Sequence, residues 1–217
     1  MKNLQLRKIL NDNTLNLNEF KGAFTLKQNL IYYNNFNDSI LKGFYFEGSG
    51  HKKDGFYLWA FVQPLFIPND SIVFTFGKRL KTIENNDWWT IDNIEKNQFE
   101  ETIKHLNNTL IGEGLTYLKK VGNTDTFIHL YKLKKDKNLK IYEAIVYSMF
   151  FLEMDEAYKE ARLLLNYIDK YEDIETEWIK QIIVRTEYLA NTSMHNAKCF
   201  LNECVKNTLT NLKLSES

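Results

Sequence analysis

Aromatic and β-branched residues gather in short runs between positions 24 and 79 of the chain. The runs are Leu30–Tyr33, Ile40–Phe46, Phe56–Val62 and Ile72–Phe76. Such residues favour β-strands, and the segments between them are rich in the turn formers Asn, Asp, Ser and Gly. The pattern therefore predicts an antiparallel meander of about four strands. Because Phe56–Val62 is apolar at both alternating sets of positions, it should be a central strand that is covered on both faces.

Beyond Trp88 and Trp89 the apolar residues recur at helical spacing, from Ile94 to Leu110. Asp92 and Glu95 have the spacing of a capping box at the start of this helix. Gly112 and Gly114 are expected to interrupt it, because glycine is a poor helix former. Shorter helices are predicted over 2–11, 115–120 and 125–134.

The lysine-rich run Lys132–Lys137 is the most linker-like part of the chain and predicts a domain boundary. Residues 1–137 would form an α+β domain with an antiparallel sheet and flanking helices. Residues 138–217 would form an all-helical region of antiparallel hairpins, since the connections between the periodic segments are short. Four helices are predicted in that region, over 139–151, 154–170, 174–190 and 193–212.

A faint internal repeat lies in the helical region. Ala161–Asn166 and Ala197–Asn202 share the pattern Ala-basic-x-apolar-Leu-Asn at a spacing of 36 residues. That spacing is near the period of about 34 residues in tetratricopeptide repeats. The small residue and the proline typical of that motif are missing, so two interpretations stay open: ordinary helical hairpins, or a repeat-like interaction surface.

Composition and charge narrow the class of protein. The 217 residues are 44% hydrophobic, with 28 basic and 28 acidic side chains, 2 Pro and 2 Cys. This excludes a disordered, collagen-like or disulfide-stapled chain, and the zero net charge removes a general attraction to polyanions. We expect no membrane association, because Phe56–Ile67, the most apolar stretch, is much shorter than a spanning helix. Without a visible export signal, reduced cysteines and a cytoplasmic location are expected.

The sequence offers few groupings typical of a metal, cofactor or catalytic site. His195 and Cys199 would share one face of a helix, but Cys204 would point away from them, so the three should not bind one metal ion. Gly48–Lys52 lacks the spacing of a phosphate-binding loop or of a nucleophile elbow. We therefore predict no metal, no cofactor and no catalytic residue; this favours a protein without enzymatic activity and leaves an enzyme as the open alternative.

Basic and aromatic residues follow the last predicted strand, and together they form the candidate partner-binding site. The residues are Lys78, Arg79, Lys81, Asp87, Trp88 and Trp89. Arg and Trp dominate the energetic hot spots of protein interfaces, and the same groups can stack single-stranded bases. The competing interpretation is that both indoles complete the core over the sheet while the basic residues are simply solvated.

The order of a helix and the strands Leu41–Phe46, Phe56–Val62 and Ile72–Gly77 resembles small bacterial α+β proteins of the toxin-immunity type. The resemblance implies a cytoplasmic, non-catalytic protein that blocks a toxin or another protein by surface complementarity. It transfers no functional residue. Two alternatives stay open: a hydrolase or nuclease whose site assembles only in three dimensions around Glu84–Trp89, and a binder of single-stranded nucleic acid.

Overall fold

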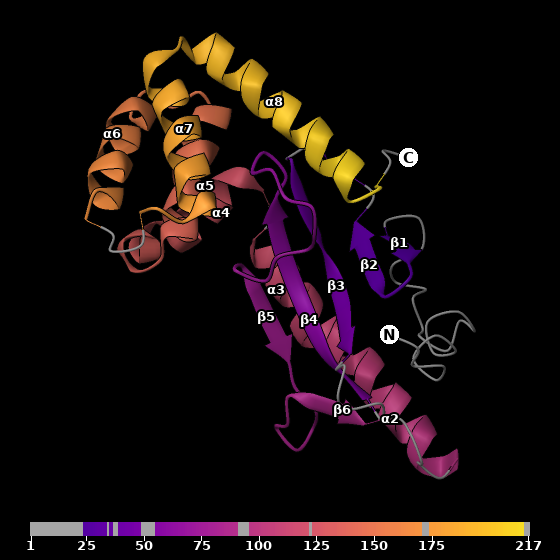
Figure 1. Ribbon diagram of the computed structural model, residues 1–217. Helices are drawn as coiled ribbons and strands as arrows, with labels where there is room; N and C mark the ends of the chain where they lie inside the picture. The colour runs from indigo at the N-terminus through magenta and orange to yellow at the C-terminus, as the bar shows by residue number, and fades with distance from the viewer. Residues whose placement is uncertain are drawn as a thin grey trace.

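The computed structural model describes residues 24–33, 35–36, 39–48, 55–90, 96–121, 123–170 and 174–214, and these contain one antiparallel sheet. Its strands are β1 (Phe24–Lys27), β2 (Leu30–Tyr33), β3 (Ile40–Gly48), β4 (Gly55–Pro64), β5 (Gly77–Leu80) and β6 (Trp88–Thr90). Neighbours in sequence pair from β1 to β5, and β6 adds to β4 (Figure 1). The predicted α+β class with an antiparallel meander is confirmed.

Strand β4 is the centre of the sheet. Along one edge it pairs with β3, from Gly48 opposite Phe56 to Ile40 opposite Pro64. Along the other edge it pairs first with β6 and then with β5. Two strands thus share one edge of β4, because β4 is longer than either of them. The predicted central position of this apolar strand is confirmed, but its coverage on both faces is incomplete, because Tyr57 and Trp59 are only partly buried.

The prediction of a strand over Ile72–Phe76 is wrong. These residues belong to the loop that leads from β4 to β5, and the strand begins only at Gly77. The buried side chain of Gln63 holds the loop: its Oε1 accepts from the backbone N–H of Val73, and its Nε2 donates to the carbonyl of Ser71. The apolar residues of the run serve to cover the sheet, since Phe74 packs edge-on against Phe61 of β4.

Helices account for most of the chain after β6. They are α2 (Lys96–Thr109), the π-helix η2 (Leu110–Gly114), α3 (Leu115–Lys120), α4 (Thr124–Tyr131), the 3₁₀-helix η3 (Lys132–Lys137), α5 (Leu139–Phe151), α6 (Ala157–Ile168), α7 (Glu177–Asn191) and α8 (Met194–Asn211). In Figure 1, α2 and α3 lie behind the sheet, and α5, α6 and α7 gather at one end of it. Helix α8 runs back towards β1, where the ammonium of Lys27 donates to the carbonyls of Leu212 and Lys213.

Gly112 and Gly114 do not interrupt the helix as predicted. The chain stays helical from α2 through η2 into α3, and the five residues around the glycines widen into a π-helical turn. Gly114 does not break the helix, but the packing of the helix against the sheet requires a residue without a side chain there. A Cβ at this position would come within 2.5 Å of the Phe44 ring and 3.1 Å of Leu80. The glycine lets the helix backbone approach the sheet closely.

The predicted helices of the C-terminal region are confirmed, with ends that shift by a few residues. Helix α5 is at their centre, and all of its residues from Ile141 to Phe150 are buried. Neighbouring helices α4, α6 and α8 contact it along its length, and Tyr147 reaches Thr186 of α7. Both copies of the faint repeat bury their alanine, Ala161 in α6 and Ala197 in α8.

Some predictions fall outside the residues that the structure describes: the helix over 2–11, the Asp92–Glu95 capping box and residues 49–52 of the glycine-containing turn. Within the described part, no helix combines the length and the apolar composition needed to cross a membrane.

Candidate functional site

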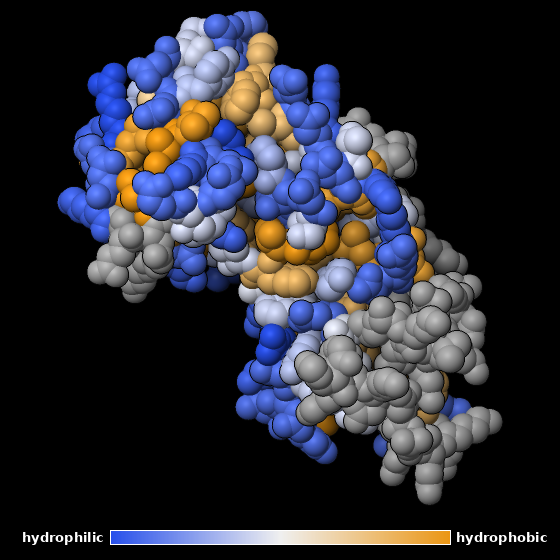
Figure 2. Space-filling model, viewed as in Figure 1, coloured by the Kyte–Doolittle hydropathy of each residue, from blue (hydrophilic) through white to orange (hydrophobic). Residues whose placement is uncertain are grey.

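The two faces of the sheet carry different side chains because successive residues of a strand point to opposite sides. One face, covered by α2, η2 and α3, consists of fully buried residues such as Phe44, Phe46 and Leu58. The other, which we call the open face, presents the partly buried side chains of Tyr57, Trp59 and Trp88, while Phe61 and Gln63 on the same face are fully buried. Figure 2 shows an apolar area over β4 and the loop that follows it on this side of the molecule.

Aromatic residues of the open face form a continuous stack around Arg79. The Arg79 guanidinium carbon lies 4.4 Å from the centre of the Tyr57 ring and 4.5 Å from that of Trp59. On its other side, Trp59 is stacked with Phe74 at 4.7 Å. Trp88 meets the Tyr57 ring edge-on at 4.8 Å. We call the five residues Trp88, Tyr57, Arg79, Trp59 and Phe74 the aromatic ladder.

The strand register places the ladder residues side by side. Trp59 is the direct partner of Arg79 across β4 and β5, and Tyr57 is the direct partner of Trp88 across β4 and β6. Because β5 and β6 both pair with β4, side chains from these three strands meet in one cluster. Cross-strand pairs of this kind, with a cation over ring faces, stabilise both the sheet and the position of the cation.

Carboxylates fix the polar ends of the ladder. Asp87 accepts from Arg79 Nη1 at 3.2 Å, and its other oxygen lies 3.8 Å from the Lys81 ammonium. The indole N–H of Trp59 donates to Glu47 Oε2 at 2.8 Å. Arg79 Nε is buried and has no hydrogen-bond partner among the described residues. Ring stacking and these polar contacts therefore hold the ladder in one arrangement.

The structure divides the predicted site between the two faces of the sheet. Arg79, Lys81, Asp87 and Trp88 come together on the open face. By contrast, Lys78 pairs with Glu113 of η2 at 2.7 Å on the helix-covered face.

Trp89 belongs to the core. It is 1% exposed, its indole N–H donates to the carbonyl of Leu80, and its ring stacks with those of Phe56 and His105. The interpretation that an indole completes the core thus holds for Trp89, and it does not hold for Trp88.

The sequence prediction missed the residues that complete the ladder, Tyr57, Trp59 and Phe74. A signal for the first two was present, because Tyr57 and Trp59 are two apart in a strand and must share a face. No comparable signal marks Phe74, whose place depends on a loop that folds back over the sheet.

A hollow lies between β6, the preceding turn and α2, in the region predicted for a site that assembles in three dimensions. Its volume is about 450 Å³, and Glu84, Trp88, Glu101 and His105 contribute to its wall. The His105 Nε2 atom is buried without a hydrogen-bond partner among the described residues. His105 shares this wall with the carboxylates of Glu84 and of Glu101, its neighbour on α2, and imidazole and carboxylate groups are the types that general acid–base chemistry uses.

The cysteines lie as their helical spacing predicts. Cys199 is exposed, with its Sγ 3.7 Å from His195 Nε2, whereas Cys204 is buried on another side of α8. Burial raises the pKa of the Cys204 thiol to about 11. Across the residues that the structure describes, no three His, Cys, Asp or Glu side chains converge as ligands of a metal ion would.

Comparison with known proteins adds no family assignment: a scan against protein-family models, a search of curated proteins and a search of solved structures each found no match.

Proposed function

We propose that the chain is a non-catalytic protein-binding module that contacts its partner through the aromatic ladder. The observation that carries the proposal is the placement of Arg79 between Tyr57 and Trp59 on a partly exposed sheet face. Trp, Tyr and Arg are the residue types most enriched in interface hot spots. Because stacking and the Asp87 ion pair already hold these side chains, little rotamer entropy is lost when a partner docks.

Geometry favours a protein over single-stranded nucleic acid as the partner. Bases bind by stacking on open ring faces, but Trp59 already packs against Arg79 and Phe74. The charges around the ladder are also nearly balanced. Arg79 and Lys81 are offset by Asp87 and Glu47, so there is little surplus to attract a phosphate backbone.

The partner that we propose is a toxin-like enzyme of the cytoplasm, which the module would block by surface complementarity. This step rests on the resemblance of the strand region to proteins of the toxin-immunity type. A rigid, preformed surface suits such a role, because an inhibitor that must outcompete a substrate gains affinity from preorganisation.

Affinity purification of the tagged chain from its native cytosol, with and without nuclease treatment, tests the proposal. Wild type is compared with Arg79→Ala and Trp88→Ala, and the matched control is Arg162→Ala, because Arg162 is exposed on α6, away from the sheet. We expect a stoichiometric protein that survives nuclease, is retained by the control, and binds each ladder variant at least ten-fold more weakly.

Three outcomes would contradict the proposal. Loss of the partner on nuclease treatment would indicate a nucleic-acid binder. Full retention by both ladder variants would move the binding surface elsewhere. Absence of any stoichiometric partner would leave the module without a function and favour the second candidate.

That second candidate is a hydrolase acting at the hollow beside His105, and the buried, unpartnered Nε2 of this residue favours it. It is tested with p-nitrophenyl esters and phosphodiesters as substrates. Activity that disappears in His105→Gln and persists in His129→Gln, an exposed histidine on α4, would support a hydrolase; no activity in wild type would exclude one for these bonds.

A further inference from the structure

A separate cavity lies where the loop after β4 meets helices α5 and α7. Its volume is about 130 Å³, and it is open to solvent on one side. Apolar residues of the loop and of α7 form much of the wall, among them Ile67, Pro68, Val73 and Ile182. For scale, an engineered apolar cavity of roughly 150 Å³ accommodates a benzene molecule. The space therefore fits a ring or a short branched chain.

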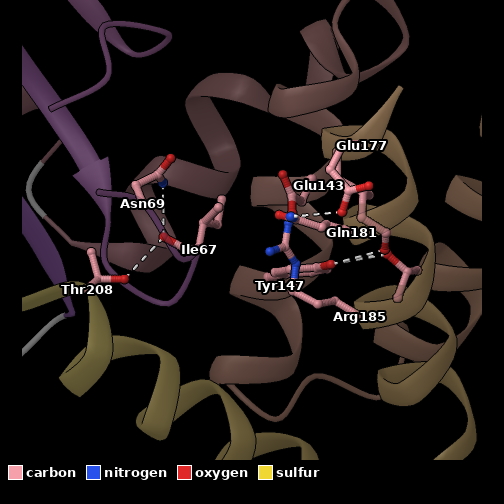
Figure 3. A network of polar contacts seen from close by, with 10 residues as sticks. Ile67, Asn69, Glu143, Tyr147, Glu177, Gln181, Arg185 and Thr208 are labelled. Carbon is pink, nitrogen blue, oxygen red and sulfur yellow. Dashed lines mark hydrogen bonds and ion pairs between the residues drawn. The ribbon is translucent and has the colours of Figure 1, made fainter. Parts of the chain in front are cut away.

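An ion pair forms the polar wall of the cavity. Arg185 Nη2 of α7 donates to Glu143 Oε1 of α5 at 2.9 Å, and Glu143 is only 3% exposed. In Figure 3 the Arg185 guanidinium lies next to Glu143 and Tyr147, and the loop with Ile67 and Asn69 faces it from across the gap. Tyr147 is itself anchored, since its hydroxyl lies 3.2 Å from Thr186 Oγ1.

Arg185 has more donors than its carboxylate partner uses. A guanidinium carries five N–H groups, and the bonds to Glu143 and to the Tyr147 hydroxyl leave some of them free. Its Nε is buried without a hydrogen-bond partner in the described part of the chain. Buried donors are nearly always satisfied in native proteins, so this orphan leaves the guanidinium able to donate to a further acceptor, a water molecule or a ligand oxygen.

The mouth of the cavity adds a second cation. Lys140 of α5 belongs to the wall, its ammonium lies 5.4 Å from the centre of the Trp178 ring, and it makes no salt bridge with any described residue. Two cations, Lys140 and Arg185, thus face one carboxylate, Glu143, which leaves a positive surplus.

Stability alone does not explain this arrangement. Replacing a buried ion pair by apolar residues of similar volume is often neutral or stabilising, because burying charges costs desolvation energy. The cavity wall already contains apolar residues, so apolar side chains in place of Glu143 and Arg185 would extend an existing apolar wall. A charged pair next to an open cavity is typical of a ligand site.

We infer that this cavity binds a small organic carboxylate. Its oxygens would accept hydrogen bonds from Arg185 and Lys140, and its apolar body would fill the space between Ile67, Pro68 and Ile182. Planar pairing of a carboxylate with a guanidinium is among the stronger polar contacts in proteins. The site is formed by other residues than the aromatic ladder, so the inference does not rest on the proposed function.

Titration of the full chain with benzoate and with benzamide tests the inference. The two probes have nearly the same shape, but only benzoate carries a charge that Arg185 and Lys140 would recognise. We expect saturable benzoate binding by calorimetry and by chemical-shift changes of Trp178 and its neighbours, at least ten-fold tighter than for benzamide. No saturable benzoate binding, or equal binding of benzamide, would overturn the inference.

Variants locate the site and separate binding from folding. Glu143→Gln/Arg185→Gln removes both charges together, leaves no lone buried ion, and should weaken benzoate binding at least ten-fold. Lys140→Gln changes an exposed residue at the mouth, so it folds in any case, and should weaken binding at least three-fold. The control Lys159→Gln, exposed on α6, should bind like wild type. Benzoate binding that survives Lys140→Gln at full strength would overturn the inference.

Discussion

Two neighbouring tryptophans on β6 show how differently the faces of the sheet are built. Trp88 lies on the open face, partly exposed, with its ring edge-on to Tyr57. Trp89 lies on the helix-covered face, 1% exposed, with its indole N–H bonded to the Leu80 carbonyl. Adjacent tryptophans therefore have different environments: one is partly exposed on a sheet face and the other is buried in the core. The alternation of side chains along the strand decides which is which.

The faces also differ in how their polar groups are satisfied. On the helix-covered face the buried residues are almost purely apolar, so packing and area burial supply the stabilisation. On the open face two of the large side chains have a polar end with a carboxylate partner: Trp59 bonds to Glu47, and Arg79 bonds to Asp87. These polar ends can meet either water or a partner, whereas Arg79 Nε is buried and has no hydrogen-bond partner among the described residues.

Truncating the two tryptophans is the sharpest test of this contrast. We expect Trp89→Ala to lower the free energy of unfolding by about 3–5 kcal/mol, the usual cost of a large cavity in a core. Trp88→Ala should cost about 1 kcal/mol or less, because its ring remains partly in water in the folded state. Urea unfolding followed by circular dichroism measures both. Equal losses would place Trp88 in the core and remove it from the proposed contact surface.

The two arginine–carboxylate pairs extend the comparison to charges. Arg185→Ala leaves the carboxylate of Glu143 buried without its cation, so we expect a loss of about 3 kcal/mol. Arg79→Ala leaves Asp87 in contact with water, and exposed pairs contribute about 0–1 kcal/mol. The same urea experiment compares them. A small loss for Arg185→Ala would mean that water reaches Glu143 freely through the cavity.

The sequence predicts the elements that depend on contacts between neighbouring residues better than those that depend on contacts between distant residues. Strands β2, β3 and β4 and helices α5–α8 are marked by local periodicity, and they were predicted. The strand identity of β6 was not, because three residues carry no period and their faces depend on pairing with β4. The Ile72–Phe76 run has the composition of a strand, yet the bonds from Gln63 keep it as a loop.

The candidate sites divide in the same way. Arg79, Asp87 and Trp88 are close in sequence, and their grouping was predicted from that proximity. Glu143 and Arg185 are on different helices, 42 residues apart, and neither stands in a motif. Only the packing of α5 against α7 brings them together, so no local pattern marks the cavity.

The pH dependence of stability separates the buried pair from the exposed one. Burial of the Glu143 carboxyl outweighs the attraction of Arg185 and raises its pKa above the ordinary value. The folded state therefore keeps this proton at a pH where the unfolded chain has lost it. The stabilisation is complete below the ordinary glutamate pKa and is lost as the pH rises through the native one.

Glu143→Gln removes this dependence, so wild type should lose stability relative to the variant from about pH 4 upwards, by at most about 1.4 kcal/mol per pH unit. Urea midpoints of both proteins at pH 4, 5, 6 and 7 measure the difference. If wild type instead gains stability relative to the variant as the pH rises, the ion pair dominates over burial. Asp87→Asn, on the open face, is the matched control for a carboxylate in contact with water.

The two cysteines of α8 also differ in burial. Here we expect a difference in thiol reactivity and no change in the free energy of unfolding. Cys199 is exposed, whereas burial raises the pKa of Cys204 to about 11, so at pH 8 the Cys204 thiol stays protonated and shielded. Since the thiolate is the species that reacts, iodoacetamide should modify Cys199 alone in the folded protein. Mass spectrometry should find one adduct in buffer and two in urea. Rapid modification of Cys204 in buffer would show that α8 opens readily from α5, and the packing at the centre of the helical region would then be looser than its buried residues indicate.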